Sequence, residues 1–166
     1  MLVVALIGVL AGVALPLLNE MNASIKLNEA ARTVERELQD GRLKAVSSNR
    51  LIRLRTNCPA AGYVRLVEVL GSSQDTASNR CLSTAYPFPA ADNDAITRPN
   101  FDGPVRTLPA GATVTSSVIE FRPDGTAAQV VSGTAQAITT PVTVTITRNG
   151  KSKSVTINGL GKVQLQ

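Results

Sequence analysis

The residues that most often carry out chemistry in proteins are few in this chain. Its 166 residues include two cysteines, Cys58 and Cys81, and no histidine. Without histidine there can be no Ser-His or Cys-His pair, and no histidine can act as a general base. Two cysteines without histidine supply too few ligands for a structural zinc site. The sequence therefore predicts no catalytic site, no metal site and no cofactor, and it leaves the cysteines as either a disulfide or two free thiols.

Basic residues form two runs that contain no acid, in a chain of net charge +5. The first run lies between Asp40 and Glu68 and contains Arg42, Lys44, Arg50, Arg53, Arg55 and Arg65. The second run follows Asp124 and contains Arg148, Lys151, Lys153 and Lys162. Such residues can hold nucleic-acid phosphates without sequence specificity, but no aromatic residues are interleaved for base stacking. We expect a solvated basic face, with phosphate or DNA contact through the second run as the alternative.

The chain opens with an uncharged apolar run, residues 1–18, which is at the short end for a membrane-spanning helix. It lacks the basic region and the small-residue cleavage site of a secretory signal peptide. We expect it to remain in the mature protein, as a membrane anchor or as the buried stem of an assembly, with a kink at the proline. The expected packing residues of the stem are Leu2, Leu6, Val9, Val13 and Pro16.

The apolar run continues into an amphipathic segment, residues 19–48. Apolar or small residues recur there at alternating spacings of four and three, which indicates a seam on one face of a helix. The seam residues are Leu27, Ala31, Val34, Leu38, Gly41 and Ala45. The two segments together predict one long helix whose second half packs on the chain's own globular domain.

Residues 49–166 are predicted to be rich in strands. Between Leu51 and Thr56, apolar residues alternate with Arg53 and Arg55, which is typical of a half-buried strand. Asn149-Gly150 predicts a tight hairpin between strands 142–147 and 154–157. Further strands are expected at 63–70, 113–122, 127–131 and 161–165, with a long loop region at about 71–111. The predicted fold is α+β, a long helix packed on an antiparallel sheet or on a two-sheet domain.

The apolar run resembles a known family. Residues 1–16, MLVVALIGVLAGVALP, are similar to the N-terminal stem of type IV pilins and type II secretion pseudopilins, where such a stretch ends in Ala-x-Pro. In that family a basic leader, a Gly cleaved by prepilin peptidase, and Phe-Thr-Leu-Ile-Glu with an N-methylated Phe precede the stretch. None of these precedes Met1, so the resemblance implies that Met1 is internal and that the missing elements are encoded in frame upstream.

Two later segments narrow the resemblance to the FimT/GspH group. Residues 118–127, VIEFRPDGTA, resemble its F-x-P-D/R-G segment, and residues 155–163, VTINGLGKV, resemble its closing strand and terminal turn. The resemblance implies a pilin-like fold and a minor pilin or pseudopilin, which is a structural subunit and not an enzyme. It would lie in the inner membrane with a periplasmic domain, and would then join other pilins in a type IV pilus or a type II secretion pseudopilus.

Export to the periplasm would affect what is expected of the two cysteines and of the aspartates in the long loop region. In a periplasmic domain, Cys58 and Cys81 are expected to form a disulfide that closes a loop of about 24 residues. Some pseudopilins bind calcium in loops like the one that holds Asp92, Asp94 and Asp102. Because the EF-hand spacing is missing, we expect a plain solvated loop there, with calcium as the alternative.

Two other functions stay open. Some FimT-type minor pilins bind DNA for natural transformation through a basic Gly-Arg-x-Arg, and the matching stretch here is Gly161-Lys162-Val163-Gln164. The second cation of that motif is absent, which weakens the DNA interpretation. The other alternative is a single-span periplasmic protein that is unrelated to filaments.

Overall fold

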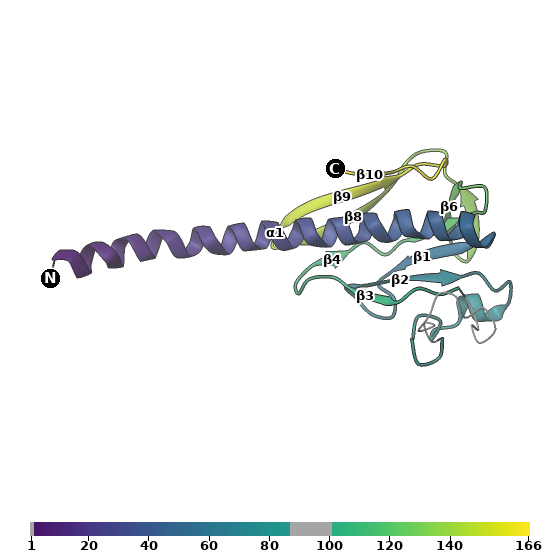
Figure 1. Cartoon of the computed structure of the whole chain (residues 1–166), viewed down its shortest axis with the longest axis horizontal. Coiled ribbons are helices and arrows are strands. Elements are labelled where there is room, and N and C mark those ends of the chain that lie inside the picture. The colour runs from purple at the N-terminus through teal and green to yellow at the C-terminus, as the bar shows by residue number, and fades with distance from the viewer. Residues whose placement is uncertain (1, 87–100) are drawn as a thin grey trace.

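A computed structural model describes the backbone of residues 2–86 and 101–166, and the side chains of residues 20–86 and 101–166. One helix, α1 (Leu2–Ser48), extends along the whole molecule and continues through Pro16. Its first part projects beyond the domain, and its second part lies against the strands (Figure 1). The prediction of one helix packed on a β domain is therefore confirmed.

The seam predicted on α1 forms the helix side of the core. All six seam residues are buried, from Leu27 to Ala45, and Ala30 joins them. The helix lies close to the strands because the seam contains small residues. A Cβ atom at Gly41 would lie 2.8 Å from Leu66 Cδ2 and 3.2 Å from Phe121 Cδ2. A larger side chain there would push the helix away from the core.

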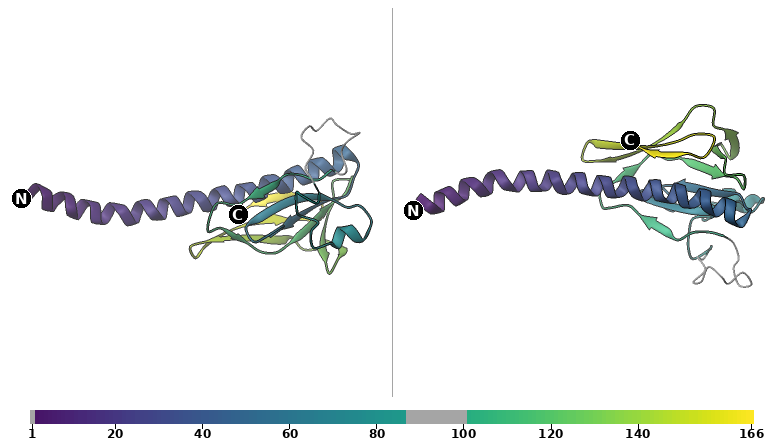
Figure 2. Two further views of the ribbon diagram at one scale, coloured as in Figure 1. Left: turned by 90° about the horizontal axis from the view of Figure 1, so that it is seen from below. Right: turned by 45° about the horizontal axis from the view of Figure 1, so that its top comes forward.

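The strands form two antiparallel sheets that lie on either side of α1 (Figure 2). The first sheet has the order β3-β2-β1-β5-β6-β7, and the second has the order β10-β9-β8-β4. The first sheet consists of β1 (Ile52–Thr56), β2 (Tyr63–Glu68), β3 (Val105–Thr107), β5 (Val118–Phe121), β6 (Ala127–Val131) and β7 (Thr134–Ala137). The second consists of β4 (Thr113–Val114), β8 (Val142–Arg148), β9 (Lys151–Ile157) and β10 (Val163–Leu165). A short 3-10 helix, η1 (Ser73–Thr76), lies in the loop after β2.

Two predictions about strands were wrong. The single strand expected over residues 113–122 is split between the sheets. Thr115 donates its N–H to Thr145 O of the second sheet, whereas Ser117 donates to Thr56 Oγ1 of the first. The chain therefore changes sheets between these residues. Strand β7 was not expected, because its side chains are mostly exposed and show no apolar alternation.

The two ends of the domain contain different turns and loops. We call the end nearer to the N-terminal stem the proximal end, and the other the distal end. Helix α1 ends at the distal end and β1 returns from there, so the β1–β2 turn is proximal (Figure 1). Loop 108–112 and the tip of the β8–β9 hairpin lie with it, since Leu108 N donates to Gly62 O and Arg148 Nε donates to Ala110 O. The β5–β6 and β9–β10 turns are distal.

Candidate functional site

The two C-terminal segments singled out in the sequence meet at the distal end, beside α1. The β5–β6 turn contains Pro123-Asp124-Gly125, and the β9–β10 turn contains residues 158–162. Ala127 N donates to Gly159 O across the two turns, at 2.9 Å. Arg42 of α1 reaches both turns, and its Nε donates to Gly125 O at 3.0 Å. Segments far apart in the sequence thus form one junction, which we call the motif junction.

Glycine is required at this junction. Gly125 and Gly161 have φ values of +81° and +72°, which side chains with a Cβ rarely adopt. A Cβ at Gly161 would also clash with Gly125 O and would lie 2.9 Å from Arg42 Nε. The second glycine therefore makes room for the Arg42 side chain.

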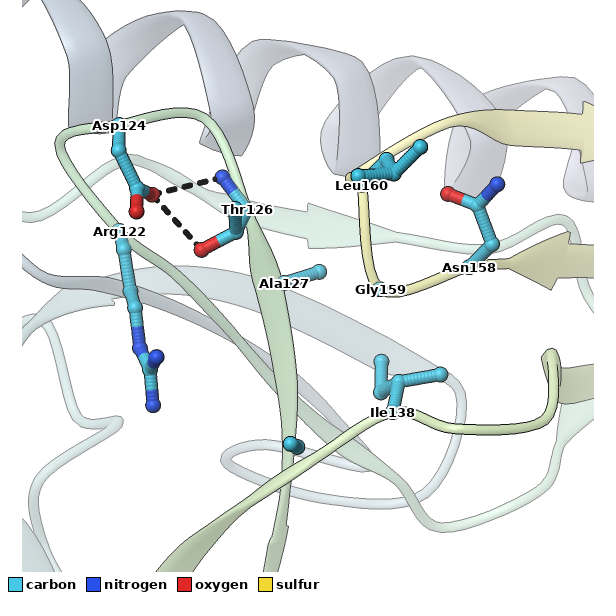
Figure 3. A pocket seen from close by; sticks show the side chains of 9 residues that line it. Arg122, Asp124, Thr126, Ala127, Ile138, Asn158, Gly159 and Leu160 are labelled. Atoms are coloured by element: carbon cyan, nitrogen blue, oxygen red, sulfur yellow. Dashed lines mark hydrogen bonds between the residues drawn. The ribbon is translucent and has the colours of Figure 1, made fainter.

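A pocket of about 510 Å³ opens beside the motif junction (Figure 3). Asp124 Oδ1 accepts from Thr126 N and Thr126 Oγ1, and these hydrogen bonds lower the pKa of the Asp124 carboxyl. Arg122 also lines the pocket, but its guanidinium points away from the carboxylate (Figure 3). One carboxylate thus binds both the N–H and the hydroxyl of Thr126, and these contacts fix the shape of the β5–β6 turn.

A second hollow, of about 580 Å³, lies on the α1 side of the same turns. Leu43 and Val46 of α1 border it and are 68% and 51% exposed. Arg42 and Lys162 supply basic groups beside them. The distal end therefore combines apolar and basic surface along the helix.

A buried charge cluster lies beneath the loop that joins β2 to β3. Arg80 and Asp102 form an ion pair, and the side chains of both are fully buried. Arg80 Nη2 donates to Asp102 Oδ1 at 2.7 Å and to Glu68 O at 2.8 Å, while the guanidinium lies 4.3 Å from the centre of the Tyr86 ring. Asp102 Oδ1 also accepts from Glu68 N at 2.8 Å. The pair thereby fastens the loop to the end of β2.

Arg65 is the second buried cation in this cluster. It donates to three main-chain oxygen atoms of the loop, Gly103 O at 2.9 Å, Cys81 O at 3.1 Å and Tyr86 O. Its Nη2 also lies 3.7 Å from Asp102 Oδ2. Burial lowers the pKa of the Arg65 guanidinium, and the Asp102 carboxylate opposes that shift. The described parts of the loop, residues 69–86 and 101–104, are thus folded over the outer face of the first sheet.

Cys58 and Cys81 form a disulfide, and their Cα atoms are 5.4 Å apart. Cys58 follows β1, whereas Cys81 lies next to Arg80 in the loop. The bond therefore holds the same loop that the two arginines fasten, and it joins that loop to the proximal end of β1.

Comparison with known proteins identifies the family. Residues 30–161 match the family described as type II transport protein GspH. The chain belongs to the GspH family. Its α+β fold is pilin-like. Among curated protein sequences, none matches the chain significantly.

Solved structures of similar fold come from two bacteria. The type IV minor pilin FimU of Pseudomonas aeruginosa is 20% identical, over 88% of this chain and 92% of that one, with a TM-score of 0.54. A second crystal form of FimU gives 21% identity and a TM-score of 0.51 over 84% of this chain and 92% of that one. The minor pseudopilin EpsH of the Vibrio cholerae type 2 secretion system is 14% identical, over 85% and 96%, with a TM-score of 0.50. At these identities the likeness shows the fold.

In this GspH-family chain, the basic run between Asp40 and Glu68 is not one solvated face. Arg65 is buried, and that expectation was wrong for it. Arg53 pairs with Glu120, with its Nη2 2.8 Å from Oε2, and Arg42 is bound to the motif junction. Arg55 Nη1 is buried and has no hydrogen-bond partner among the described residues, and burial lowers the pKa of this guanidinium.

The second basic run is divided between the two ends of the GspH-family domain. Arg148, Lys151 and Lys153 lie at the tip of the β8–β9 hairpin, which is proximal. Lys162 lies in the β9–β10 turn, which is distal. The four residues therefore lie in two separate groups, and phosphate contact through them stays a prediction.

The calcium alternative concerns three aspartates of the loop. Asp92 and Asp94 lie outside the described residues, whereas Asp102 is engaged by Arg80 and Arg65. Within residues 20–86 and 101–166, no group of carboxylates or thiols is arranged to hold a metal ion.

The stem residues Leu2, Leu6, Val9, Val13 and Pro16 lie in the part of α1 whose side chains are not described. Their role in packing stays a prediction. Within the portion of the chain that was described, no helix is both long and apolar enough to cross a membrane.

The charge cluster and the role of Arg42 were not foreseen. One signal was present for Arg65, which interrupts the apolar run 63–70, YVRLVEVL. A strand with apolar residues on both faces is covered on both faces, and a charged residue within it needs a partner. No comparable signal marks Arg42, because its partner is a backbone oxygen 83 residues away.

Proposed function

We propose that this chain is a minor subunit of a type IV pilus or a type II secretion pseudopilus, and that it assembles through α1. One observation carries the proposal. The helix projects beyond its own domain (Figure 1). Met21 and Ile25 precede Leu27, the first buried helix residue among the described side chains, and are 55% and 61% exposed. Large apolar side chains left uncovered next to an apolar run are typical of a surface that a partner covers.

The mechanism that we propose is an exchange of apolar contacts. Residues 1–18 hold the subunit in the inner membrane before assembly, with the domain in the periplasm. On assembly the same residues leave the lipid and pack against the stems of neighbouring subunits. The stem residues Leu2, Leu6, Val9, Val13 and Pro16 recur at spacings of four and three, which places them along one stripe of a helix. Such a stripe suits helix-to-helix packing in a filament core.

Assembly through the stem can be tested by placing a charged residue in it. Val9→Asp introduces a carboxylate that costs about 2.5–3.5 kcal/mol at the centre of a membrane helix, even on the mildest insertion scale. Asn22→Asp places the same charge on an exposed site of the same helix and serves as the control. We expect the first variant to be missing from sheared filaments and the second to be present. Wild-type incorporation of Val9→Asp would refute assembly through the stem.

DNA binding is the weaker candidate for this chain. It would draw on Arg148, Lys151, Lys153 and Lys162, and the last of these lies at the other end of the domain. We therefore treat DNA as an outcome to be tested and not as the proposed function.

A further inference from the structure

Three described segments at the proximal end of the domain carry no acidic side chain. The β1–β2 turn (residues 57–62), loop 108–112 and the hairpin segment 145–154 contain no Asp or Glu. The hairpin segment contains Arg148, Lys151 and Lys153. No ion pair joins any of these three cations to an acid within the described ranges.

The three cations lie on one face of the hairpin. Arg148 pairs directly with Lys151, and Lys153 pairs with the buried residue Ile146. Alternate residues of a strand share a face, so the cations continue the row that begins with Ile146 inside the core. Like charges directly opposite one another destabilise a strand pair. The domain thus bears a local electrostatic cost, which an anionic partner would offset.

The position of the tip along α1 follows from two observations. Gly161, just after β9, approaches Arg42 of the helix, and β9 runs from the tip toward that point. Its seven residues span about 20 Å, which corresponds to about 13 residues of helix. Counting about 13 residues back from Arg42 places the tip level with the helix near Glu29, about half a turn from Leu27. Independently, Leu27 is the first buried residue of α1 among those with described side chains.

This position lies close to where the membrane surface would be. This placement rests on the proposed function, in which residues 1–18 occupy the bilayer. Leu18 to Glu29 spans about 16 Å of helix, and the headgroup layer takes up about 5–7 Å of that distance. The remaining gap is similar to the Debye length of about 8 Å at physiological salt. A helix tilt of about 20°, which is average for membrane helices, would bring one side of the domain still closer.

We propose that the β8–β9 hairpin tip, through Arg148, Lys151 and Lys153, docks on anionic phospholipid headgroups while the subunit waits in the membrane. The charges of α1 near this level do not oppose this, because Glu20 offsets Lys26 and the exposed Glu29 offsets the exposed Arg32. The contact fixes which side of the domain faces the lipid, and extraction into a filament breaks it. Since it is electrostatic, it weakens as salt rises.

The test uses the full chain in vesicles, with a donor dye on Ser152→Cys, an exposed site at the tip, and acceptor dyes on the lipid headgroups. One set of vesicles is phosphatidylcholine, and the other also contains phosphatidylglycerol. We expect stronger energy transfer on the anionic vesicles and loss of the difference at high salt. Lys151→Gln with Lys153→Gln should lower the ratio of docked to undocked tips by about five-fold per cation.

Arg122→Gln with Lys162→Gln is the matched control, because it removes the same charge from exposed residues at the distal end. The control should leave the transfer unchanged. Equal transfer on neutral and anionic vesicles, or equal losses in both double variants, would overturn the proposal. The tip variant could instead lose binding to duplex DNA at physiological salt while its energy transfer to the lipid dyes stays unchanged. That result would overturn lipid docking in favour of DNA binding.

A separate experiment tests whether the stem inserts into the membrane. Flotation with neutral vesicles at high salt reports membrane insertion without help from the basic tip. A chain that floats but shows no preference for anionic lipid contradicts the docking proposal alone. A chain that does not float contradicts the membrane anchor of the proposed function, and the docking proposal fails with it.

Discussion

Arg80 and Asp102 form an ion pair within the connection between β2 and β3, and neither side chain has exposed surface. Arg65 lies beside them, so one carboxylate faces two buried guanidinium groups. A buried ion pair adds little net stability, but removing one partner strands a charge in the interior. The cluster therefore makes the fold sensitive to the loss of Asp102.

Asp102→Asn keeps the shape of the side chain and removes its charge. We expect it to lower the free energy of unfolding by about 3–5 kcal/mol, because Arg80 and Arg65 lose their compensating charge. Urea unfolding of the full chain in detergent measures the change. Asp40→Asn, at an exposed site on α1, is the control and should change stability by less than about 0.5 kcal/mol. Similar values for both variants would show that the buried charges are not coupled.

Reduction of the Cys58–Cys81 disulfide should destabilise the domain by about 3 kcal/mol, since the bond closes a loop of about 24 residues. The same unfolding measurement with and without reductant tests this. The double variant Cys58→Ser with Cys81→Ser should be equally destabilised and should not respond to reductant. Two alkylated thiols in native periplasmic protein, seen by intact mass without reductant, would show that the bond does not form in the cell.

Gly161→Ala should be more destabilising than Gly150→Ala. Both glycines have similar φ values, +72° and +74°, so both substitutions carry a backbone cost of about 1–2 kcal/mol. Nothing lies within 4 Å of a Cβ at Gly150, whereas at Gly161 the new atom meets Arg42 and Gly125. The crowding should add about 1–3 kcal/mol, measured as the difference in unfolding free energy. Equal losses would mean that Arg42 moves aside freely.

Glu37 should make stability fall as pH rises. Burial raises the pKa of its carboxyl above the ordinary value of 4.5, although the hydrogen bond from Arg106 opposes this. The folded state thus holds the proton to a higher pH than the unfolded state does. The stabilising contribution is complete below pH 4.5 and is lost as pH rises through the raised pKa. Comparing the pH profiles of unfolding for the wild type and Glu37→Gln isolates this contribution, which should be absent in the variant.

Local periodicity was enough to predict the helix and its buried face. The spacing of Leu27, Val34 and Leu38 depends only on helical geometry, and the structure buries all three. The Asn149-Gly150 hairpin was predicted for the same reason, because a two-residue turn is encoded by its own residues. The break in strand 113–122 was missed because it depends on partners in β1 and β8, which are distant in sequence.

The candidate sites were harder to predict than the fold. The basic residues between Asp40 and Glu68 have similar neighbours in the sequence, yet Arg65 is buried and Arg53 pairs with Glu120. What separates them is the loop that folds back over the first sheet. Folding of a loop onto a sheet leaves no periodic pattern, so composition alone could not show which arginine would be covered.

The way in which Arg65 holds this loop has an evolutionary consequence. Its three acceptors are the carbonyl oxygens of Cys81, Tyr86 and Gly103, and a carbonyl oxygen is present whatever side chain the residue carries. These three contacts therefore do not depend on the side chains of the loop, whereas the contacts of Arg80, Cys81 and Asp102 do. Side chains that point outward from the loop can be exchanged, or replaced by a grafted epitope, without loosening its hold on the domain. A filament built from such subunits could vary its surface while keeping its scaffold unchanged.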